Sequence, residues 1–256
     1  MLTPTRTALT ENRWIVRFKP TACVTFRLIC FTYAGGTAMT YRRWPHALPA
    51  DIDVCAVELP GHGSRAGERS FTRMSDLVPP LLTELMPCFF DAPFALFGHS
   101  LGALVAFELA RELQRHGVPS PAGLFVSGRG APLTQEAEEI HDMPDAEFVR
   151  RVKDMNGTPA AVFENAELLA MILPPLRADF ELGETHVHSP GMLLTCPITA
   201  FGGSGDEHTS LEKLALWRDQ TNGPFSMHIF PGDHFFLHSC EMAVVHEVHR
   251  QLFRRR

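Results

Sequence analysis

The pentapeptide Gly98–Gly102, which reads Gly-His-Ser-Leu-Gly, decides the fold of this chain. It lies between a short apolar run, Pro93–Phe97, and a segment with helical periodicity, Leu101–His116. A serine flanked by glycines at such a junction indicates a turn so sharp that only glycine fits beside it, which leaves the hydroxyl exposed. The simpler interpretation is a glycine-rich turn whose serine caps the helix. The two interpretations differ in whether an acid and a histidine follow in the right order.

Short apolar runs alternate with helical patterns, which predicts a mostly parallel central sheet flanked by helices. Combined with the serine turn, this predicts an α/β-hydrolase fold in a single domain spanning residues 1–256. The expected strands are 27–31, 54–58, 94–97, 123–127, 198–201 and 226–230.

One segment interrupts the alternation. About 70 residues separate the strand ending at Ser127 from the strand near Ile198, far more than an ordinary connection. Helical patterns occur within it at Asp145–Met155 and at Asn165–Leu173, the second followed by two prolines. We therefore expect a helical lid over the active site at about residues 133–190. A pair of ordinary covering helices is the alternative.

Composition restricts the class of protein. The chain has 256 residues, is 45% hydrophobic and carries a formal net charge of −6, which argues against nucleic acid as a partner. It has no apolar stretch of membrane-spanning length, and because residues 1–19 are polar we expect no secretory signal there. Its six cysteines fall mostly in apolar segments without a Cys-x-x-Cys motif, which is typical of reduced, buried thiols. We expect a cytoplasmic enzyme that does not bind membranes.

An acid and a histidine do follow the serine. Asp206 comes directly after a predicted strand, and His234 follows the last one. The order Ser100, Asp206, His234 is that of the hydrolase fold. In such a triad the imidazole accepts the serine proton during attack, and the carboxylate fixes the imidazole tautomer. Asp233 and Glu207 are alternative acids, but each only neighbours a motif residue.

Most of the thirteen histidines need another explanation. His62, His99, His228 and His238 are expected to serve in packing, at the surface or in support of the site. The pairs His234/His238 and His186/His188 have metal-ligand spacing, but no cysteine or carboxylate completes either one in the sequence. We therefore expect no metal.

A serine hydrolase also needs an oxyanion hole made of two backbone N–H groups. The first belongs to Leu101, the residue after the serine. The second should come from the loop after an early strand, Phe31–Gly36, whose glycines allow close approach of a ligand. Ala34 is the best candidate there and Tyr33 the second.

Six segments together resemble the type II thioesterases, stand-alone α/β-hydrolases that accompany polyketide synthases and non-ribosomal peptide synthetases. They read Cys-Phe-Thr-Tyr-Ala-Gly-Gly (30–36), Leu-Pro-Gly-His-Gly-Ser-Arg (59–65), Phe-Gly-His-Ser-Leu-Gly-Ala (97–103), Phe-Val-Ser-Gly-Arg (125–129), Leu-Arg-Ala-Asp (176–179) and Gly-Asp-His-Phe-Phe (232–236). The resemblance extends from about Trp14 to Leu237. Two positions depart from the family, which usually has proline at Thr32 and more often arginine at His62.

The resemblance implies that Ser100, Asp206 and His234 hydrolyse acyl thioesters on the phosphopantetheine arm of acyl or peptidyl carrier proteins. This removes aberrant or stalled units in antibiotic biosynthesis and requires no cofactor besides the arm that the substrate carries. Carrier domains are usually acidic, so local positive charge is expected near the pocket mouth. The candidates follow strand ends and are Arg42, Arg43, Arg65, Arg69 and Arg129. We expect a monomer.

Two other interpretations use the same residues. The chain could be a fatty-acid-type acyl-carrier thioesterase or a carboxylester hydrolase with the same triad. It could instead be a non-catalytic binding module with a hydrolase fold, although the filled triad positions argue against this.

Overall fold

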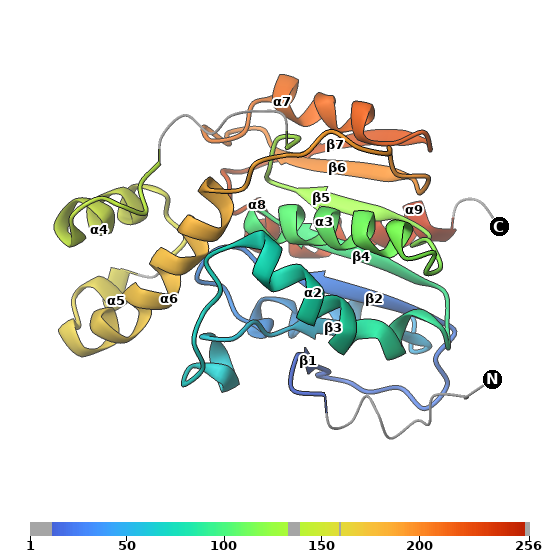
Figure 1. Ribbon diagram of the computed structural model, residues 1–256, viewed down its shortest axis with the longest axis horizontal. Coiled ribbons are helices and arrows are strands. Elements are labelled where there is room, and N and C mark those ends of the chain that lie inside the picture. Colours follow the sequence, from blue (N-terminus) through green and yellow to red (C-terminus); the bar gives the residue numbers. More distant parts are fainter. Residues whose placement is uncertain (1–11, 133–138, 159, 254–256) are drawn as a thin grey trace.

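The computed structural model describes residues 12–132, 139–158 and 160–253. Their strands form one seven-stranded sheet in the order β1-β3-β2-β4-β5-β6-β7 (Figure 1). Only β1 runs antiparallel to its neighbour, and the other pairs are parallel. The strands are β1 (Ile15–Val16), β2 (Phe26–Phe31), β3 (Ile52–Val57), β4 (Phe94–His99), β5 (Leu124–Ser127), β6 (Ile198–Gly203) and β7 (Phe225–Phe230).

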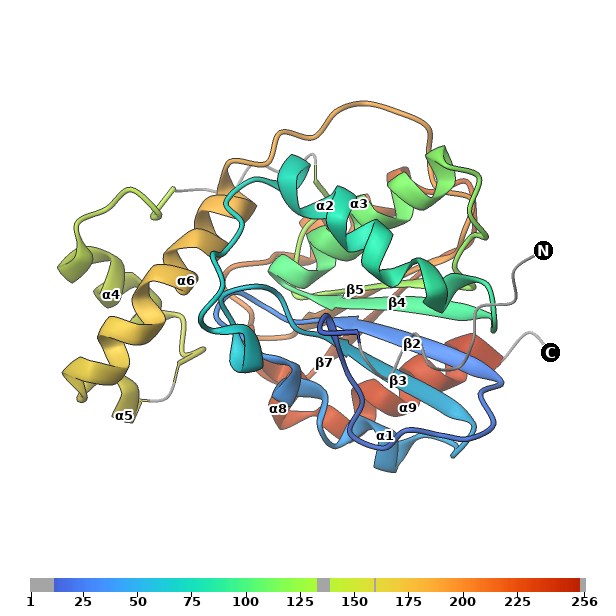
Figure 2. The same cartoon turned by 60° about the horizontal axis from the view of Figure 1, so that its bottom comes forward.

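Helices cover both faces of this sheet, with α2 and α3 on one side and α1, α8 and α9 on the other (Figure 2). The helix α7 packs on the same side as α3. The bounds are α1 (Trp44–Ala47), α2 (Met74–Leu85), α3 (Leu101–Arg115), α7 (Leu211–Ala215), α8 (Phe236–Ser239) and α9 (Glu241–Phe253). Four short 3-10 helices complete the described connections: η1 (Ala38–Tyr41), η2 (Gly63–Arg65), η3 (Met86–Phe89) and η4 (Leu216–Gln220).

The central strands are apolar throughout because both of their faces are covered. Every residue of β2 is buried. Ile29 and Phe31 join the core under α2 and α3, whereas Leu28 and Cys30 join the core under α1 and α9. This alternation places successive side chains on opposite faces.

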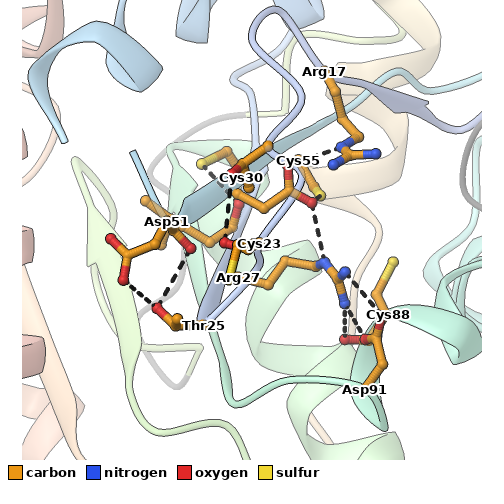
Figure 3. A network of polar contacts seen from close by, with 12 residues as sticks. Arg17, Cys23, Thr25, Arg27, Cys30, Asp51, Cys55, Cys88 and Asp91 are labelled. Carbon is orange, nitrogen blue, oxygen red and sulfur yellow. Dashed lines mark hydrogen bonds and ion pairs between the residues drawn. The ribbon is translucent and has the colours of Figure 1, made fainter. Parts of the chain in front are cut away.

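A buried arginine, Arg27, ties together segments near the amino ends of the central strands (Figure 3). It pairs with Phe94 at the start of β4, whereas Ser100 follows the other end of that strand. Arg27 in β2 donates to Asp53 in β3 at 3.4 Å, to the Cys88 carbonyl at 2.9 Å, and to both oxygens of Asp91. Arg17 donates to the second Asp53 oxygen at 2.8 Å. A buried guanidinium is tolerated when its charge is paired and its donors are used, as here.

The mostly parallel sheet with flanking helices confirms the predicted fold class. All six predicted strands are present, with ends that differ by one or two residues. The strand β1 was missed, because two residues are too short to show a period. The helix expected at 165–173 was ended too early, since it continues to Glu184 through Pro174 and Pro175. The prolines remove backbone donors, but burial of side chains beyond them maintains the helix.

The inserted segment carries α4 (Asp145–Asp154), α5 (Ala160–Phe163) and α6 (Ala166–Glu184), which lie together beyond the carboxyl ends of the strands (Figures 1 and 2). Ile140, Phe148, Val152 and Leu176 form a small apolar cluster of their own. Residues 133–138, at the start of the expected lid, lie outside the described residues. No helix in the described ranges is both long and apolar enough to cross a membrane.

Candidate active site

Ser100 occupies a strained turn between β4 and α3. Its φ of 53° and ψ of −116° lie in a region that residues other than glycine rarely adopt. Its N–H donates to the Ser127 carbonyl at 2.7 Å. A Cβ at Gly98 would lie 2.0 Å from the Gly102 oxygen, and one at Gly102 would lie 2.2 Å from the Phe31 oxygen. Both flanking glycines are therefore required by close backbone approach, as the sharp-turn interpretation predicts.

The structure brings Asp206 and His234 together. The two loops that carry them are joined by backbone hydrogen bonds, from Ser204 to Phe230 at 2.8 Å and from Gly205 to Gly232 at 2.8 Å. Across these loops, the His234 Nδ1 atom lies 2.9 Å from Asp206 Oδ2. The acid and base predicted from chain order are thus hydrogen-bonded partners.

The surroundings of Asp206 keep its carboxylate ionised. The side chain is fully buried. Burial by itself would raise the pKa of Asp206, but the hydrogen bond and charge of His234 and the amides of His208 and Thr209 outweigh it, so the pKa is lowered. Those two amides donate to Oδ1 at 2.9 and 3.1 Å. An ionised, fixed carboxylate can orient an imidazole and stabilise its protonated form.

His234 lies next to the serine turn. Its ring centroid is 5.3 Å from that of His99, the residue before Ser100. In the described part of the chain, Ser100 Oγ has no hydrogen bond to His234. Catalytic hydrogen bonds are often long before substrate binds. His234 therefore packs on the residue that precedes Ser100, and its hydrogen bond to Ser100 stays a prediction.

The alternative acids lie elsewhere. Asp233 is exposed and accepts from the Phe235 amide at 2.8 Å, so it caps its own turn. Glu207 is exposed. His99 is completely buried, with Nδ1 2.8 Å from Ser127 Oγ, and its pKa is well below the usual value because of burial and the nearby His234 and His238. His99 is therefore a neutral packing residue.

The predicted oxyanion loop abuts the serine turn, since Gly102 packs directly on the carbonyls of Phe31 and Thr32. Among the described residues, neither the Ala34 amide nor the Leu101 amide has a hydrogen-bond acceptor, so both are available to an oxyanion. The Gly35 amide is already used, because it donates to Asp179 of α6 at 2.7 Å. His62 also contacts Asp179, a pairing for which no local sequence pattern is a signal.

One of the five proposed docking arginines is corrected by the structure. Arg65 is only 6% exposed. It donates to Glu68 and to the Glu58 carbonyl, and its guanidinium stacks 4.2 Å over the Trp14 ring. This side chain stabilises the loop before α2 and offers no free charge. Arg42, Arg43 and Arg69 are exposed, and Arg129 is half-buried beside Gly183 of α6.

The histidine pair 186/188 does have a carboxylate neighbour, contrary to the sequence argument. Glu108 of α3 approaches both, and the three potential ligand atoms lie within 4.8 Å of one another. Arg111 donates to both Glu108 oxygens at 3.0 and 3.1 Å, so a positive charge already neutralises the carboxylate. The absence of a metal stays a prediction.

Comparison with known proteins agrees with this geometry. Residues 26–252 match the family model described as the thioesterase domain. The chain is 38% identical over 242 residues to the gramicidin S biosynthesis protein GrsT of Aneurinibacillus migulanus, covering 94% of each chain. It is 38% identical over 225 residues to the thioesterase PikA5 of Streptomyces venezuelae, covering 88% of this chain and 80% of the relative.

A solved structure extends the likeness to three dimensions. The type II thioesterase BorB from the borrelidin biosynthetic cluster superposes with a TM-score of 0.84 at 35% identity, over 93% of this chain and 97% of BorB. The α/β-hydrolase fold and the family resemblance predicted from the sequence are confirmed. This chain belongs to the thioesterase family and is a hydrolase of the serine thioesterase type.

Proposed function

We propose that the protein hydrolyses acyl thioesters held on the phosphopantetheine arm of acyl or peptidyl carrier proteins, and so clears aberrant or stalled units from a polyketide or non-ribosomal peptide synthase. The observation that carries the proposal is the strained turn at Ser100 together with the hydrogen-bonded pair of His234 and Asp206, whose imidazole packs on His99, the residue before Ser100. Membership of the thioesterase family supports the bond that is cleaved, and relatives named for antibiotic biosynthesis support the setting.

The chemistry follows from the roles of these groups. Ser100 Oγ attacks the thioester carbonyl while His234 Nε2 takes the proton, and Asp206 stabilises the resulting imidazolium. The Leu101 and Ala34 amides bind the oxyanion. A thiol with a pKa near 8.5 leaves readily as thiolate, so collapse of the tetrahedral intermediate needs little acid assistance. The departing thiolate takes the proton from the His234 imidazolium, which restores the neutral base. Water then attacks the Ser100 ester while His234 accepts its proton, and His234 returns that proton to Ser100 Oγ as the free acid leaves.

The segment over the carboxyl edge serves as the lid in this proposal. Gly157 packs against the Phe235 ring, beside His234, so closely that a Cβ there would lie 2.3 Å from it. On α6, Leu168 and Met171 are 44% and 68% exposed and give the insertion an apolar surface. Contact with the His234 loop is consistent with a lid and is less expected of an ordinary covering helix.

A substrate comparison tests the proposal. We expect kcat/KM for an acyl-phosphopantetheinyl carrier protein to exceed that for an aryl ester of the same acyl group, because only the carrier uses surface contacts. Ser100→Ala should remove both activities. Preference for the aryl ester would favour a carboxylester hydrolase. Failure of a fluorophosphonate to label Ser100 would instead favour a non-catalytic module.

Positive charge near the site should contribute to carrier binding. Arg42→Glu and Arg69→Glu should each raise KM for the carrier substrate several-fold, and less so at high salt, because exposed charges are screened beyond about 8–10 Å. Turnover of a small uncharged thioester should not change. Equal losses on both substrates would reject docking through these arginines. The monomeric state stays a prediction.

A further inference from the structure

Asp179 is a buried carboxylate that joins three segments distant in sequence. It lies on α6 and is only 4% exposed. Its Oδ2 atom accepts from the Gly35 amide at 2.7 Å and lies 2.8 Å from His62 Nε2. The inserted helix, the predicted oxyanion loop and the loop after β3 therefore meet at one oxygen atom.

The geometry around His62 requires a protonated ring. Nε2 faces the Asp179 carboxylate, and Nδ1 lies 3.2 Å from the Pro60 carbonyl oxygen. Both neighbours are acceptors, and a neutral imidazole has only one N–H to donate. One ring nitrogen of a neutral His62 would therefore point a lone pair at an oxygen. The imidazolium satisfies both contacts.

The charges facing His62 favour the same state. Burial alone would lower the pKa of His62, but the Asp179 hydrogen bond and charge, the Pro60 carbonyl and the nearby Glu58 raise it above its ordinary value. Asp179 comes from α6, and Glu58 follows β3. Glu58 is itself buried and accepts from the Ala38 amide at 2.9 Å.

We infer that Asp179 and His62 are positioning residues that hold the Ala34 amide in the oxyanion hole. The inference rests on the proposed function. The bond to Asp179 fixes the plane of the peptide between Ala34 and Gly35, which directly follows the peptide that carries the Ala34 N–H. This restraint matters because Gly35, with a left-handed φ of 73°, can adopt other backbone conformations at little cost. Leu176 of α6 packs on the same glycine, since a Cβ added at Gly35 would lie 2.7 Å from Leu176 Cδ1. Seating of α6 thus completes the loop that binds the oxyanion.

A second buried pair on the same helix provides a matched control. Glu184 is 3% exposed, lies 2.6 Å from His141 Nδ1, and accepts from the Ile140 and His141 amides at 3.0 Å. It also ties α6 to a loop through one carboxylate and one histidine. That loop belongs to the insertion itself and does not contribute to the oxyanion hole. Loss of either pair should lower the melting temperature, but only loss of the Asp179 pair should affect catalysis.

The test compares Asp179→Asn with Glu184→Gln, using an aryl ester and a fluorophosphonate as probes. We expect Asp179→Asn to lower kcat and the rate of fluorophosphonate labelling by about 10- to 100-fold, with KM changed less than about twofold. This is less than the roughly 100- to 1000-fold for complete loss of one oxyanion donor, because the Ala34 amide is displaced and not removed. Glu184→Gln should keep kcat. Equal effects of the two variants, or a loss of Asp179→Asn confined to KM, would overturn the inference.

Charge at position 62 gives a second readout. Wild-type kcat should fall on the alkaline side as His62 loses its proton. His62→Gln should be slow at all pH values, whereas His62→Arg, whose donors stay charged, should keep activity and lose the alkaline fall. An alkaline fall that persists in His62→Arg, or full activity of His62→Gln, would contradict the role.

These probes separate failure of the inference from failure of the proposed function. Both report acylation or phosphylation of Ser100 and not turnover of a carrier protein. If Ser100→Ala kept hydrolytic activity, the proposed function would fail. If Ser100→Ala were inactive but the Asp179 and His62 variants behaved like wild type, the proposed function would stand and the positioning role alone would fail.

Discussion

The helices α3 and α6 border the same site but are held in different ways. Eleven of the 15 residues of α3 are buried, and they pack between the sheet and α2. Only three of the 19 residues of α6 are buried as whole residues, namely Leu176, Asp179 and Leu182, and the Glu184 side chain is also covered. The nucleophile is thus fixed by the core, whereas the inserted helix depends on a few contacts. Apolar burial holds one helix, and a short set of contacts that includes a charged residue holds the other.

The two helices meet different requirements of the site: a fixed position for Ser100, and an opening through which substrate can enter. The turn at Ser100 requires a rigid support because its backbone is strained. We predict that the inserted helix can leave its seat more easily than α3, because fewer apolar contacts are lost. Movement of α6 would take the Asp179 contact away from the Gly35 amide, and closure would then be coupled to the geometry of the predicted oxyanion loop.

Hydrogen exchange should show the largest contrast between the two helices. Amides in α4 and α6 should exchange at least about 100-fold faster than those in α3, because local opening precedes global unfolding where contacts are few. Acylation of Ser100 should slow exchange in α6 and leave α3 unchanged. Similar protection in both helices would reject a movable insertion.

A matched pair of glycines tests the difference in packing. A Cβ at Gly102 of α3 would lie 2.2 Å from the backbone oxygen of Phe31, whereas one at Gly183 of α6 would meet the Leu101 side chain at 3.2 Å. Gly102→Ala should therefore destabilise by about 1–3 kcal/mol and lower kcat. In Gly183→Ala the better helix propensity, up to about 1 kcal/mol, should offset the tight contact. Urea unfolding measures the change in the free energy of unfolding for both variants. Equal destabilisation by the two substitutions would contradict the difference in packing between α3 and α6.

His99 and His62 should make the free energy of unfolding depend on pH in opposite directions. The pKa of His99 is held well below its ordinary value, so only the unfolded chain gains this proton as pH falls below about 6.5. Stability should then decrease in acid by at most about 1.4 kcal/mol per pH unit. The pKa of His62 is raised, so its contribution is present in acid and is lost as pH rises through the folded-state value.

Urea unfolding between pH 5 and pH 9 checks this pair of signs. His99→Gln should flatten the acid side of the stability profile, and His62→Gln should flatten the alkaline side. Profiles with unchanged slopes in both variants would contradict the assigned protonation states.

Sequence reasoning identified the parts of the molecule that follow from local patterns. The turn at Ser100 was predictable because glycine spacing reports backbone crowding within a few residues. The partnership of Asp206 and His234 was predictable because parallel strands end at the same edge of a sheet. These predictions needed no knowledge of which side chains meet across the fold.

Contacts between distant segments were not accessible in this way. Arg65 follows a strand end like a surface arginine, yet it is buried against Trp14. Nothing near His62 or near Asp179 indicates that the two share a hydrogen bond across the fold. Such pairs depend on how the insertion seats on the sheet, and a single sequence carries no local signal for that.

The most direct test of the account is to follow the acyl group. An acyl-phosphopantetheinyl carrier protein is mixed with the enzyme, quenched within one turnover and analysed by intact-protein and peptide mass spectrometry. The account predicts that wild type carries the acyl group on the peptide containing Ser100 and releases free acid, whereas Ser100→Ala does neither. An adduct on another residue, or comparable release of acid by Ser100→Ala, would contradict it.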